Sequence, residues 1–492
     1  MPLKIHNNLT RKLEIFEPIK SSEVSMYVCG ITPYDETHLG HARAYVTFDI
    51  IKRFLNYSGY KVKHIQNITD VDDKIIKKSE IPARPAGGLN PKSETNSKSQ
   101  IQNSKQKCSE IAEKYTQAFF EVMDKINVLR ADVYPKATEH IPEMIKWISD
   151  LMNKGFAYKL DDGVYFEVDK FAGYGKLSRR KKEDQEAGAR VEVDTQKRNP
   201  LDFALWKFAK PGEPFWPSPW GEGRPGWHIE CSVMSTKYLG EQFDIHGGGL
   251  DLQFPHHENE IAQIEALTGK VPWVKYWIHN GFVNVNQQKM SKSLGNFFTL
   301  KEIYEKFDPM VVRLFLLSTH YRSPLNFSDA QLMESKEAYN RLVKTIENLD
   351  FLISKVPKSD YKVEVDETDD ELFTYKKRFE DAMNDDFNAA GAIGMIFELV
   401  RFINEHVKEE KIDKESLEDD KKMLLELCGI LGLKIEHRAE SIEHRVEELI
   451  KERELARKNK NFKRADEIRD ELKINGIIIE DTPFGAKWIK NA

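Results

Sequence analysis

The fold is decided by the stretch Ser25-Met26-Tyr27-Val28-Cys29-Gly30-Ile31-Thr32-Pro33-Tyr34 and by the helical run that follows it. Its first five residues are typical of a short buried strand, and Gly30 to Tyr34 are typical of a loop. Between Ala42 and Tyr57, large apolar residues recur at helical spacing. A strand, a loop and a helix in this order open a nucleotide-binding α/β unit, so the segment predicts a parallel sheet flanked by helices.

Two histidines and a glycine, His38, Gly40 and His41, precede this predicted helix. Gly40 allows a ligand to lie against the backbone. Both histidines fall where the helix N-terminus offers N–H groups to a phosphate. Histidines near a loop are also common in packing and on surfaces, so this stretch alone leaves a phosphate site and a structural role open.

A second strand is predicted from Tyr60 to Gln66, followed by the polar loop Asn67-Ile68-Thr69-Asp70-Val71-Asp72-Asp73. Open α/β sheets bind ligands at the carboxyl ends of their strands, which makes this loop a candidate for ligand contact. The same acids would also suit the cap and first turn of a helix.

Coordination chemistry gathers between Trp227 and Glu260. Cys231 offers a soft ligand, and His256 and Glu260 are four residues apart, which stacks them on one face of a helix. Three such groups can hold Zn²⁺ with one position left for a substrate. The spacing leaves alternatives: His257 or Glu258 could serve as a ligand instead, and a lone cysteine is often only a small buried hydrophobe.

A polar loop with two lysines, Lys289 and Lys292, extends from Gln288 to Asn296. Lysines in such a loop can neutralise phosphate, and small residues keep it mobile. An ordinary basic surface loop has the same composition.

Residues 80–107 are dominated by Pro, Gly, Asn, Ser, Lys and Gln, and they predict a surface loop that buries no core. Amphipathic helices are expected at Ile111–Val128 and Ile141–Lys154. Leu177 to Lys197 is rich in charge and is expected to be solvated. Val271 to Phe282 is rich in aromatic residues and is expected to return to the sheet.

The chain is predicted to be helical from Leu300 almost to its end. Pro357 to Asp370 is expected to be a polar linker. A single long basic helix is expected from Glu443 to Leu472, followed by a hairpin around Thr482-Pro483-Phe484-Gly485.

The bulk composition limits the class of protein. The 492 residues suffice for roughly three domains. No apolar run approaches the length of a membrane span, and the N-terminus has no apolar core of a secretory signal. Four scattered cysteines argue against a disulfide framework and fit a reducing cytosol. A net charge of −6 neither indicates nor excludes nucleic-acid binding, because local patches determine the field that a polyanion meets.

Several motifs together resemble the class I aminoacyl-tRNA synthetases. His38-Leu39-Gly40-His41 is similar to their HIGH signature, with Leu39 in place of the usual Ile, and Lys289-Met290-Ser291-Lys292-Ser293 is similar to their KMSKS signature. The segments at 27–32, 67–73, 226–231 and 246–260 resemble the cysteinyl-tRNA synthetase family. The resemblance covers nearly the whole chain.

The resemblance also implies the site residues. A zinc ion, one per chain, would be held by Cys29, Cys231, His256 and Glu260. Thr69, Trp227 and His246 match positions that line the amino-acid pocket, together with Cys29. His38, Gly40, His41, Lys289 and Lys292 would act on ATP and its phosphates, with Mg²⁺ accompanying the nucleotide.

The implied activity is that of a cysteine–tRNA ligase, which converts ATP and L-cysteine to cysteinyl adenylate and transfers the cysteine to the 3′-terminal adenosine of cysteine tRNA. The alternative is a ligase that joins cysteine to a non-tRNA acceptor. A cytoplasmic monomer without membrane contact is expected, since the family precedent points that way.

The predicted fold class is α/β: a Rossmann-type parallel-sheet catalytic domain with a connective insertion, then an α-helical bundle and a small mixed α/β domain. The expected regions are the first catalytic half at 1–115 with the low-complexity insertion at 80–107, the connective insertion at 116–200, the second catalytic half at 201–300, a stem-contact and helical bundle domain at 301–434, and an anticodon-binding domain at 435–492.

Overall fold

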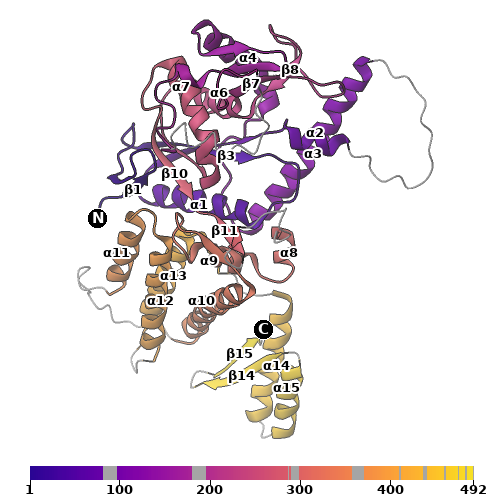
Figure 1. The fold of residues 1–492 in the computed structure, drawn as a ribbon. Helices are drawn as coiled ribbons and strands as arrows, with labels where there is room; N and C mark the ends of the chain where they lie inside the picture. Colours follow the sequence, from indigo (N-terminus) through magenta and orange to yellow (C-terminus); the bar gives the residue numbers. More distant parts are fainter. Residues whose placement is uncertain are drawn as a thin grey trace, which may run out of the picture. The chain divides into compact units, whose positions relative to one another are not determined.

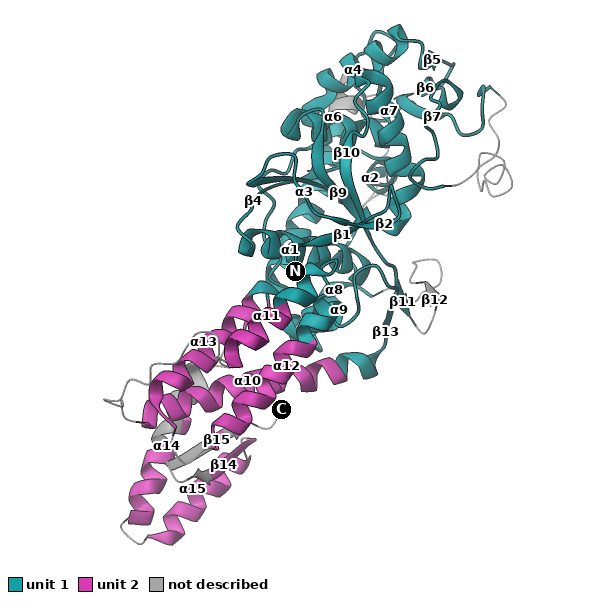
Figure 2. Ribbon diagram, turned by 90° about the vertical axis from the view of Figure 1, so that its left-hand side faces the viewer, with its two compact units in different colours: residues 1–333, 380–393, 430–432 teal, residues 334–379, 394–429, 433–492 magenta. Residues whose placement is uncertain are grey.

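The structure is a computed structural model. It describes residues 1–80, 97–179, 196–285, 288–289, 298–356, 371–408, 412–435, 440–458, 461–474, 476–482 and 485–490. The chain divides into two compact units (Figure 2). Unit 1 comprises residues 1–333, 380–393 and 430–432, and unit 2 comprises residues 334–379, 394–429 and 433–492. Within the described residues, no helix is long and apolar enough to cross a membrane.

The core of unit 1 is a parallel sheet with the strand order β10-β9-β3-β4. Its strands are β3 (Glu23–Ile31), β4 (Lys61–Ile68), β9 (Phe243–Gly249) and β10 (Val274–Asn280). The predicted α/β class is therefore confirmed. The expected strands at Ser25–Cys29 and Tyr60–Gln66, and the return of the chain to the sheet after Val271, are also found.

Helices cover both faces of this sheet (Figure 1). Helix α1 (Leu39–Tyr57) packs so closely on one face that a Cβ at Gly247 would overlap the Phe48 ring. Helices α6 (Trp227–Leu239) and α7 (Glu258–Thr268) lie on the other side. Side chains alternate along a strand, so His246 points away from α1 and toward the α6 side.

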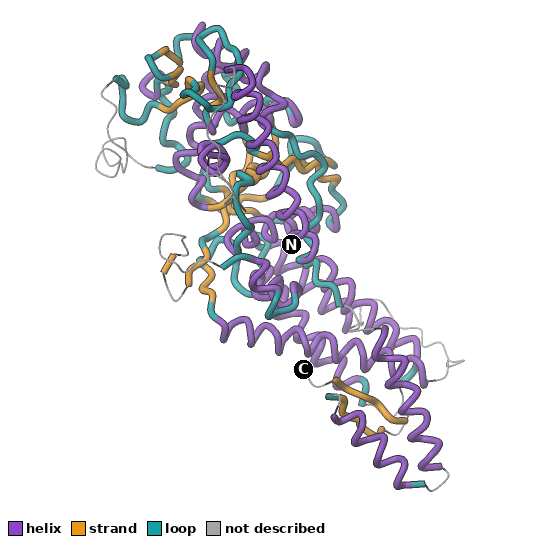
Figure 3. Tube along the Cα trace, turned by 90° about the vertical axis from the view of Figure 1, so that its right-hand side faces the viewer, coloured by secondary structure: helices purple, strands orange, loops and turns teal. Residues whose placement is uncertain are grey.

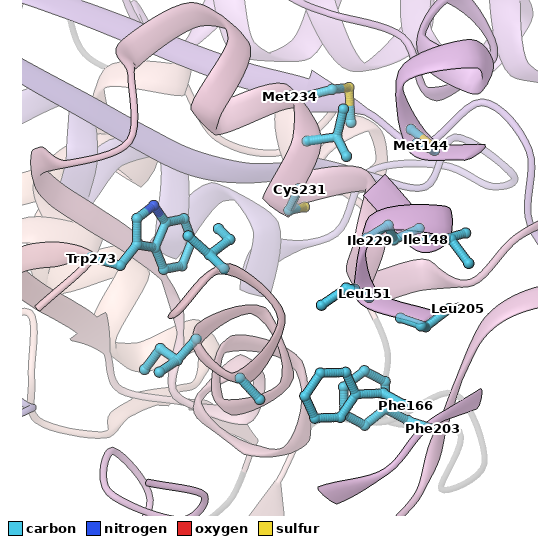
Figure 4. Packing of buried hydrophobic residues seen from close by; sticks show 14 of the residues in the cluster. Met144, Ile148, Leu151, Phe166, Phe203, Leu205, Ile229, Cys231, Met234 and Trp273 are labelled. Carbon is cyan, nitrogen blue, oxygen red and sulfur yellow. The ribbon is translucent and has the colours of Figure 1, made fainter. Parts of the chain in front are cut away.

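A second sheet of unit 1 is antiparallel, with the order β5-β6-β7-β8. Its strands are β5 (Ala157–Lys159), β6 (Gly163–Phe166), β7 (Phe203–Phe208) and β8 (Gly223–Pro225). They lie on both sides of residue 200, where we expected the insertion to end. Helix α4 (Ile141–Asn153) joins them in a continuous core with α6, in which Ile148, Phe166 and Ile229 meet (Figure 4).

The remaining elements of unit 1 are short, apart from α3. They are β1 (Lys4–Asn7), β2 (Lys12–Ile15), α2 (Asp73–Glu80), α3 (Ser97–Lys125), β11 (Val283–Val285), β12 (Gln288–Lys289), α8 (Leu300–Tyr304), α9 (Pro309–Leu317) and β13 (Leu325–Phe327).

Two expectations for unit 1 are wrong. Helix α3 begins at Ser97, inside the segment predicted to be a loop, because its Lys and Gln residues have good helix propensity and extend the amphipathic part of the helix. Leu177 is fully buried although it was placed in a solvated segment. Residues 81–96 and 180–195 lie outside the described residues.

Unit 2 is largely helical (Figure 3). The helices of this part of the chain are α10 (Asp329–Lys355), α11 (Glu371–Asn384), α12 (Ala389–His406), α13 (Lys414–Ile430), α14 (Glu440–Lys458) and α15 (Phe462–Ile474). The expected linker at 357–370 lies outside the described residues.

The single basic helix expected from Glu443 to Leu472 is wrong, because α14 and α15 are separate helices that pack on each other. Asn461 interrupts the run: its side chain accepts a hydrogen bond from the N–H of Arg464 at 3.2 Å, which caps a new helix. The predicted hairpin is confirmed, with β14 (Ile477–Thr482) antiparallel to β15 (Gly485–Lys490).

Candidate metal centre and nucleotide site

Three of the predicted site residues lie at one edge of the parallel sheet. Cys29 is near the end of β3, His246 is in the second half of β9, and Thr69 directly follows β4. In the register of the sheet, Tyr27 is opposite His246, and His246 is opposite Trp277 of β10. Parallel strands bring their carboxyl ends together, so residues far apart in sequence meet there.

Cys29, Cys231, His256 and Glu260 form a compact buried cluster. Their ligand atoms all lie within 4.8 Å of one another. Cys29 Sγ is 4.0 Å from Cys231 Sγ, and His256 Nε2 is 2.9 Å from Glu260 Oε1. Four ligands placed tetrahedrally about one zinc ion are roughly 3.3–3.8 Å apart. The separations of 4.0 and 2.9 Å lie just above and just below this range, so small side-chain shifts would bring two sulfurs, a nitrogen and an oxygen into a zinc geometry.

A second set of four, Cys29, His246, His257 and Glu260, meets the same distance condition. Hydrogen bonds distinguish the two sets. Glu260 Oε2 is 2.7 Å from His246 Nε2, so His246 supports the carboxylate whose other oxygen faces His256. The first set contains both thiols, the ligands that zinc favours, whereas the second contains one. Glu258, an alternative left open by the spacing, belongs to neither set.

The charges of the cluster depend on one another. Burial by itself raises the pKa of Cys231, but the hydrogen bond with Cys29 and the positive charge of His256 lower that pKa to about 6. Burial likewise opposes the charges of Glu260 and His256, yet their attraction lowers the pKa of Glu260 to about 2 and raises that of His256 to about 10. Burial raises the pKa of Cys29 well above its usual value. One thiolate is therefore present at neutral pH, and the Cys29 thiol and the His256 imidazolium must each lose a proton when a metal binds.

Trp227 lies against the cluster from the first turn of α6. Its ring stacks on His256 with centroids 4.1 Å apart, and the residue is 40% exposed. His246 is fully buried, and its Nδ1 has no hydrogen-bond partner among the described residues. An exposed aromatic face and a buried ring nitrogen beside one cluster suit the binding of a small polar ligand.

The hydroxyl of Thr69 already donates its one hydrogen within the protein. It accepts from Asn67 Nδ2 at 3.2 Å and donates to Glu230 Oε2 at 2.9 Å. Burial raises the pKa of Glu230 well above its usual range, and the nearby negative charge of Cys231 raises it further. Sequence reasoning missed Glu230, although an acid between Ile229 and Cys231 in a buried helix was a usable signal.

Two further histidines lie at the site: His257, which residue spacing offered as an alternative ligand, and His279, which sequence reasoning missed. His257 Nε2 is 3.2 Å from Cys29 Sγ, and His257 Nδ1 is 2.8 Å from His279 Nε2. Burial lowers the pKa of both imidazoles, to about 3 in His279, so both are neutral. The position of His279 near the end of β10 could have indicated it, because that strand was expected in the sheet.

His38 and His41 lie at the start of α1, where we expected them. His38 caps the helix by accepting the N–H of His41 at 3.3 Å, and the two rings stack with centroids 3.7 Å apart. Gly40 is in the first turn. This loop also meets the segment that follows the lysine loop, since Leu300 N donates to Thr37 O at 2.9 Å.

The two lysines of this loop lie largely outside the described residues. Lys289 ends β12, and its side chain lies outside the described part of the structure, as does the whole of Lys292. The described backbone after the lysine loop lies beside the start of α1, through the contact of Leu300 with Thr37.

Comparison with protein families gives three matches along the chain. The model of the tRNA synthetases class I (C) catalytic domain matches residues 15–337. The DALR domain matches residues 378–436, and the cysteinyl-tRNA ligase anticodon binding domain matches residues 440–488.

Individual proteins are similar over the full chain. The cysteine–tRNA ligase of Carboxydothermus hydrogenoformans is 49% identical over 99% of both chains, and that of Clostridioides difficile is 48% identical over 99% of both. Among solved structures, Mycobacterium tuberculosis methionyl-tRNA synthetase in complex with methionyl-adenylate has a TM-score of 0.56 at 14% identity, covering 83% of this chain and 89% of that one. A putative arginyl-tRNA synthetase from Campylobacter jejuni has the same TM-score at 13% identity, covering 84% and 94%. These two likenesses concern the fold alone.

Proposed function

This chain belongs to the cysteine–tRNA ligase family of class I aminoacyl-tRNA synthetases, and from this premise we propose that Cys29, Cys231, His256 and Glu260 hold one zinc ion that selects cysteine. The family's reaction joins cysteine and ATP into cysteinyl adenylate and pyrophosphate, and then transfers the cysteine to the terminal adenosine of its tRNA. One observation carries the zinc proposal. Two thiols, an imidazole and a carboxylate are buried together, and their ligand atoms all lie within 4.8 Å of one another.

The chain's own residues prepare this site for a metal. The lowered pKa of Cys231 supplies one thiolate at neutral pH, and His246 holds the carboxylate of Glu260 through its second oxygen. When bound, zinc supplies a borderline-soft Lewis acid that prefers a substrate thiolate to a serine hydroxyl. A purely apolar pocket discriminates between amino acids of nearly the same shape by only about 10–200-fold in kcat/KM, so a metal–sulfur bond is a stronger basis for selecting cysteine.

The amino-acid pocket is proposed to consist of Cys29, Thr69, Trp227 and His246. Trp227 shields His256 from solvent while presenting its own exposed face, and the free Nδ1 of the buried His246 offers a polar contact. The hydroxyl of Thr69 is satisfied by its neighbours, so this residue shapes the pocket by its position and not as a hydrogen-bond donor to substrate.

The nucleotide is proposed to bind at the start of α1, where His38, Gly40 and His41 lie. A helix N-terminus offers N–H groups and a positive partial charge to phosphate. Lys289 and Lys292 would stabilise the charge that develops on the departing pyrophosphate, with Mg²⁺ on the ATP. The substrate carboxylate is the attacking group, so this chemistry consists of positioning and charge stabilisation.

Residues 435–492 are proposed to bind the anticodon, and 301–434 to contact the tRNA stem. For stacking on anticodon bases, Trp488 of β15 is a poor candidate because it packs against the buried cluster of α14, α15 and β14, and Phe484 lies outside the described residues. A better candidate is Phe462, the first residue of α15, which is 60% exposed and is followed by Lys463 and Arg464. Exposed aromatic rings beside basic groups stack on unpaired bases.

The decisive experiment for this function compares two reactions of the purified chain. Cysteine-dependent pyrophosphate exchange reports the adenylate step, and acylation of cysteine tRNA reports the transfer. We expect both. Exchange without acylation would support the alternative, a cysteine ligase with another acceptor, which the match of residues 440–488 disfavours. We further propose a cytoplasmic monomer, and sedimentation analysis of the pure protein would test its oligomeric state.

A further inference from the structure

A short segment of the insertion, Tyr174–Ser178, is fastened to the first residue of α7. Glu258 is fully buried, and its carboxylate accepts hydrogen bonds from three backbone N–H groups of this segment. The donors are Gly175 at 3.0 Å, Leu177 at 3.2 Å and Ser178 at 2.8 Å. Backbone N–H groups that converge on one carboxylate form a strong and directional anchor.

The chain needs an anchor at this point because the backbone before Glu258 is irregular. Residues Gln253–His257 form a wide turn, inside which Phe254 is non-helical with φ −141° and ψ 133°. No side chain caps the start of α7. His256 is therefore presented by an irregular turn, and Glu260 by the first turn of a helix that has no cap.

Glu258 stands midway between these two candidate ligands, two residues from each. We propose that Glu258 is a positioning residue for the metal site, which fixes the irregular turn and the start of α7 so that His256 and Glu260 face Cys29 and Cys231. This inference rests on the zinc proposal above. It gives Glu258 a function although it is not a ligand, since its carboxylate is hydrogen-bonded to the insertion segment.

Other contacts between the same segment and α7 supply a matched control. Lys176 forms an ion pair with Glu265, two helical turns beyond Glu258, and Tyr174 Oη donates to Asn259 Oδ1 at 2.5 Å. Loss of the Lys176 ion pair weakens the attachment of the segment without touching the turn that presents His256.

The test uses full-length E258Q and K176M, with zinc affinity measured by competition with a chelator and site geometry measured from the absorption spectrum of the Co²⁺ form. The side chain of Gln has nearly the same shape, but its amide nitrogen cannot accept from an N–H. We expect E258Q to bind zinc about 10- to 100-fold more weakly, with an altered Co²⁺ spectrum, as is typical for loss of a group that orients metal ligands. K176M should stay within about threefold of wild type, as expected for a partly exposed ion pair.

Wild-type affinity and spectrum in E258Q, or an equal loss in K176M, would overturn the inference. If the wild-type chain itself bound no zinc, the zinc proposal would fail. That result differs from a failure of the role proposed here for Glu258, which requires a wild-type chain that binds zinc. If E258Q does not fold, the variant E258D tests the proposal in its place. Its carboxylate is withdrawn by about 1.5 Å and cannot reach all three N–H groups, so unchanged zinc affinity in E258D would count against the proposal.

Discussion

Cys29 on β3 and Cys231 on α6 are 202 residues apart in sequence, and their Sγ atoms lie 4.0 Å apart. This distance is too long for a disulfide and suits two ligands of one ion. The strand end and the helix that carry them belong to the two halves of the catalytic unit, which are separated in sequence by the insertion. A metal between the two thiols would therefore tie both halves together as well as bind substrate.

The first prediction concerns the metal content. Elemental analysis of the purified chain should find one zinc per molecule, and Cys231→Ser should lose most of it, because a hydroxyl is a poor ligand beside a thiolate. Cys108→Ser is a suitable control, since this buried cysteine packs against Ile75 and Ile76 away from the cluster. Full zinc retention in the Cys231 variant would exclude the proposed ligand set.

The second prediction concerns pH. In the zinc-free protein, the pKa of Cys231 is lowered to about 6, so ultraviolet thiolate absorbance should rise with a midpoint near pH 6 and vanish in Cys231→Ser. Because this pKa is depressed relative to the unfolded chain, the thiolate contributes stability that is complete above the unfolded pKa and is lost as pH falls through about 6. Zinc affinity should fall more steeply with decreasing pH below about 6, because one further proton, on Cys231, then competes for the site. A midpoint near the ordinary thiol value would contradict this assignment of charge.

Local periodicity was sufficient to predict the strand–loop–helix opening and the sheet. The proposed members of the metal cluster came from the family resemblance. The sequence could not decide between the ligand sets on residue spacing alone. The register of β3 in the sheet places Cys29 at the cluster. Hydrogen bonds with a segment some 80 residues earlier in the chain hold the Glu258 carboxylate away from it. Such long-range contacts have no signature in local sequence.

The C-terminal helices show a different limit. The sequence periodicity of residues 443–472 continues across the break between α14 and α15, and the described residues show the second helix starting with a cap at Asn461. An asparagine within a basic, polar stretch gives a weak stop signal, so one long helix was the simpler prediction.

The third prediction concerns the lysine loop. Lys292→Ala should slow adenylate formation by roughly 100-fold, the usual cost of removing one group that stabilises a developing negative charge. The dissociation constant of cysteine should change little, because the lysine acts on the phosphates. Rapid-quench kinetics on the first turnover would measure both. An unchanged rate of activation would show that this charge is not used in the step.

The fourth prediction concerns the anticodon region. Phe462→Ala should raise the KM for cysteine tRNA about 10-fold while leaving cysteine-dependent pyrophosphate exchange unchanged, because one stacked base is worth about 1–3 kcal/mol. Leu455→Ala is the matched control: it is 58% exposed on the adjacent helix, compared with 60% for Phe462, but has no ring to stack. Equal effects of the two substitutions, or none, would remove Phe462 from the proposed tRNA contacts.

The central claim is that the cluster of Cys29, Cys231, His256 and Glu260 holds a metal that takes the substrate thiolate. The most direct measurement is the absorption spectrum of the Co²⁺-substituted protein during titration with cysteine and, separately, with serine. We predict that cysteine strengthens the sulfur-to-metal charge-transfer band and that serine leaves it unchanged at any concentration, because only a thiolate adds a sulfur ligand. Identical spectra with the two amino acids, in a protein that does hold one metal ion at this cluster, would contradict the account.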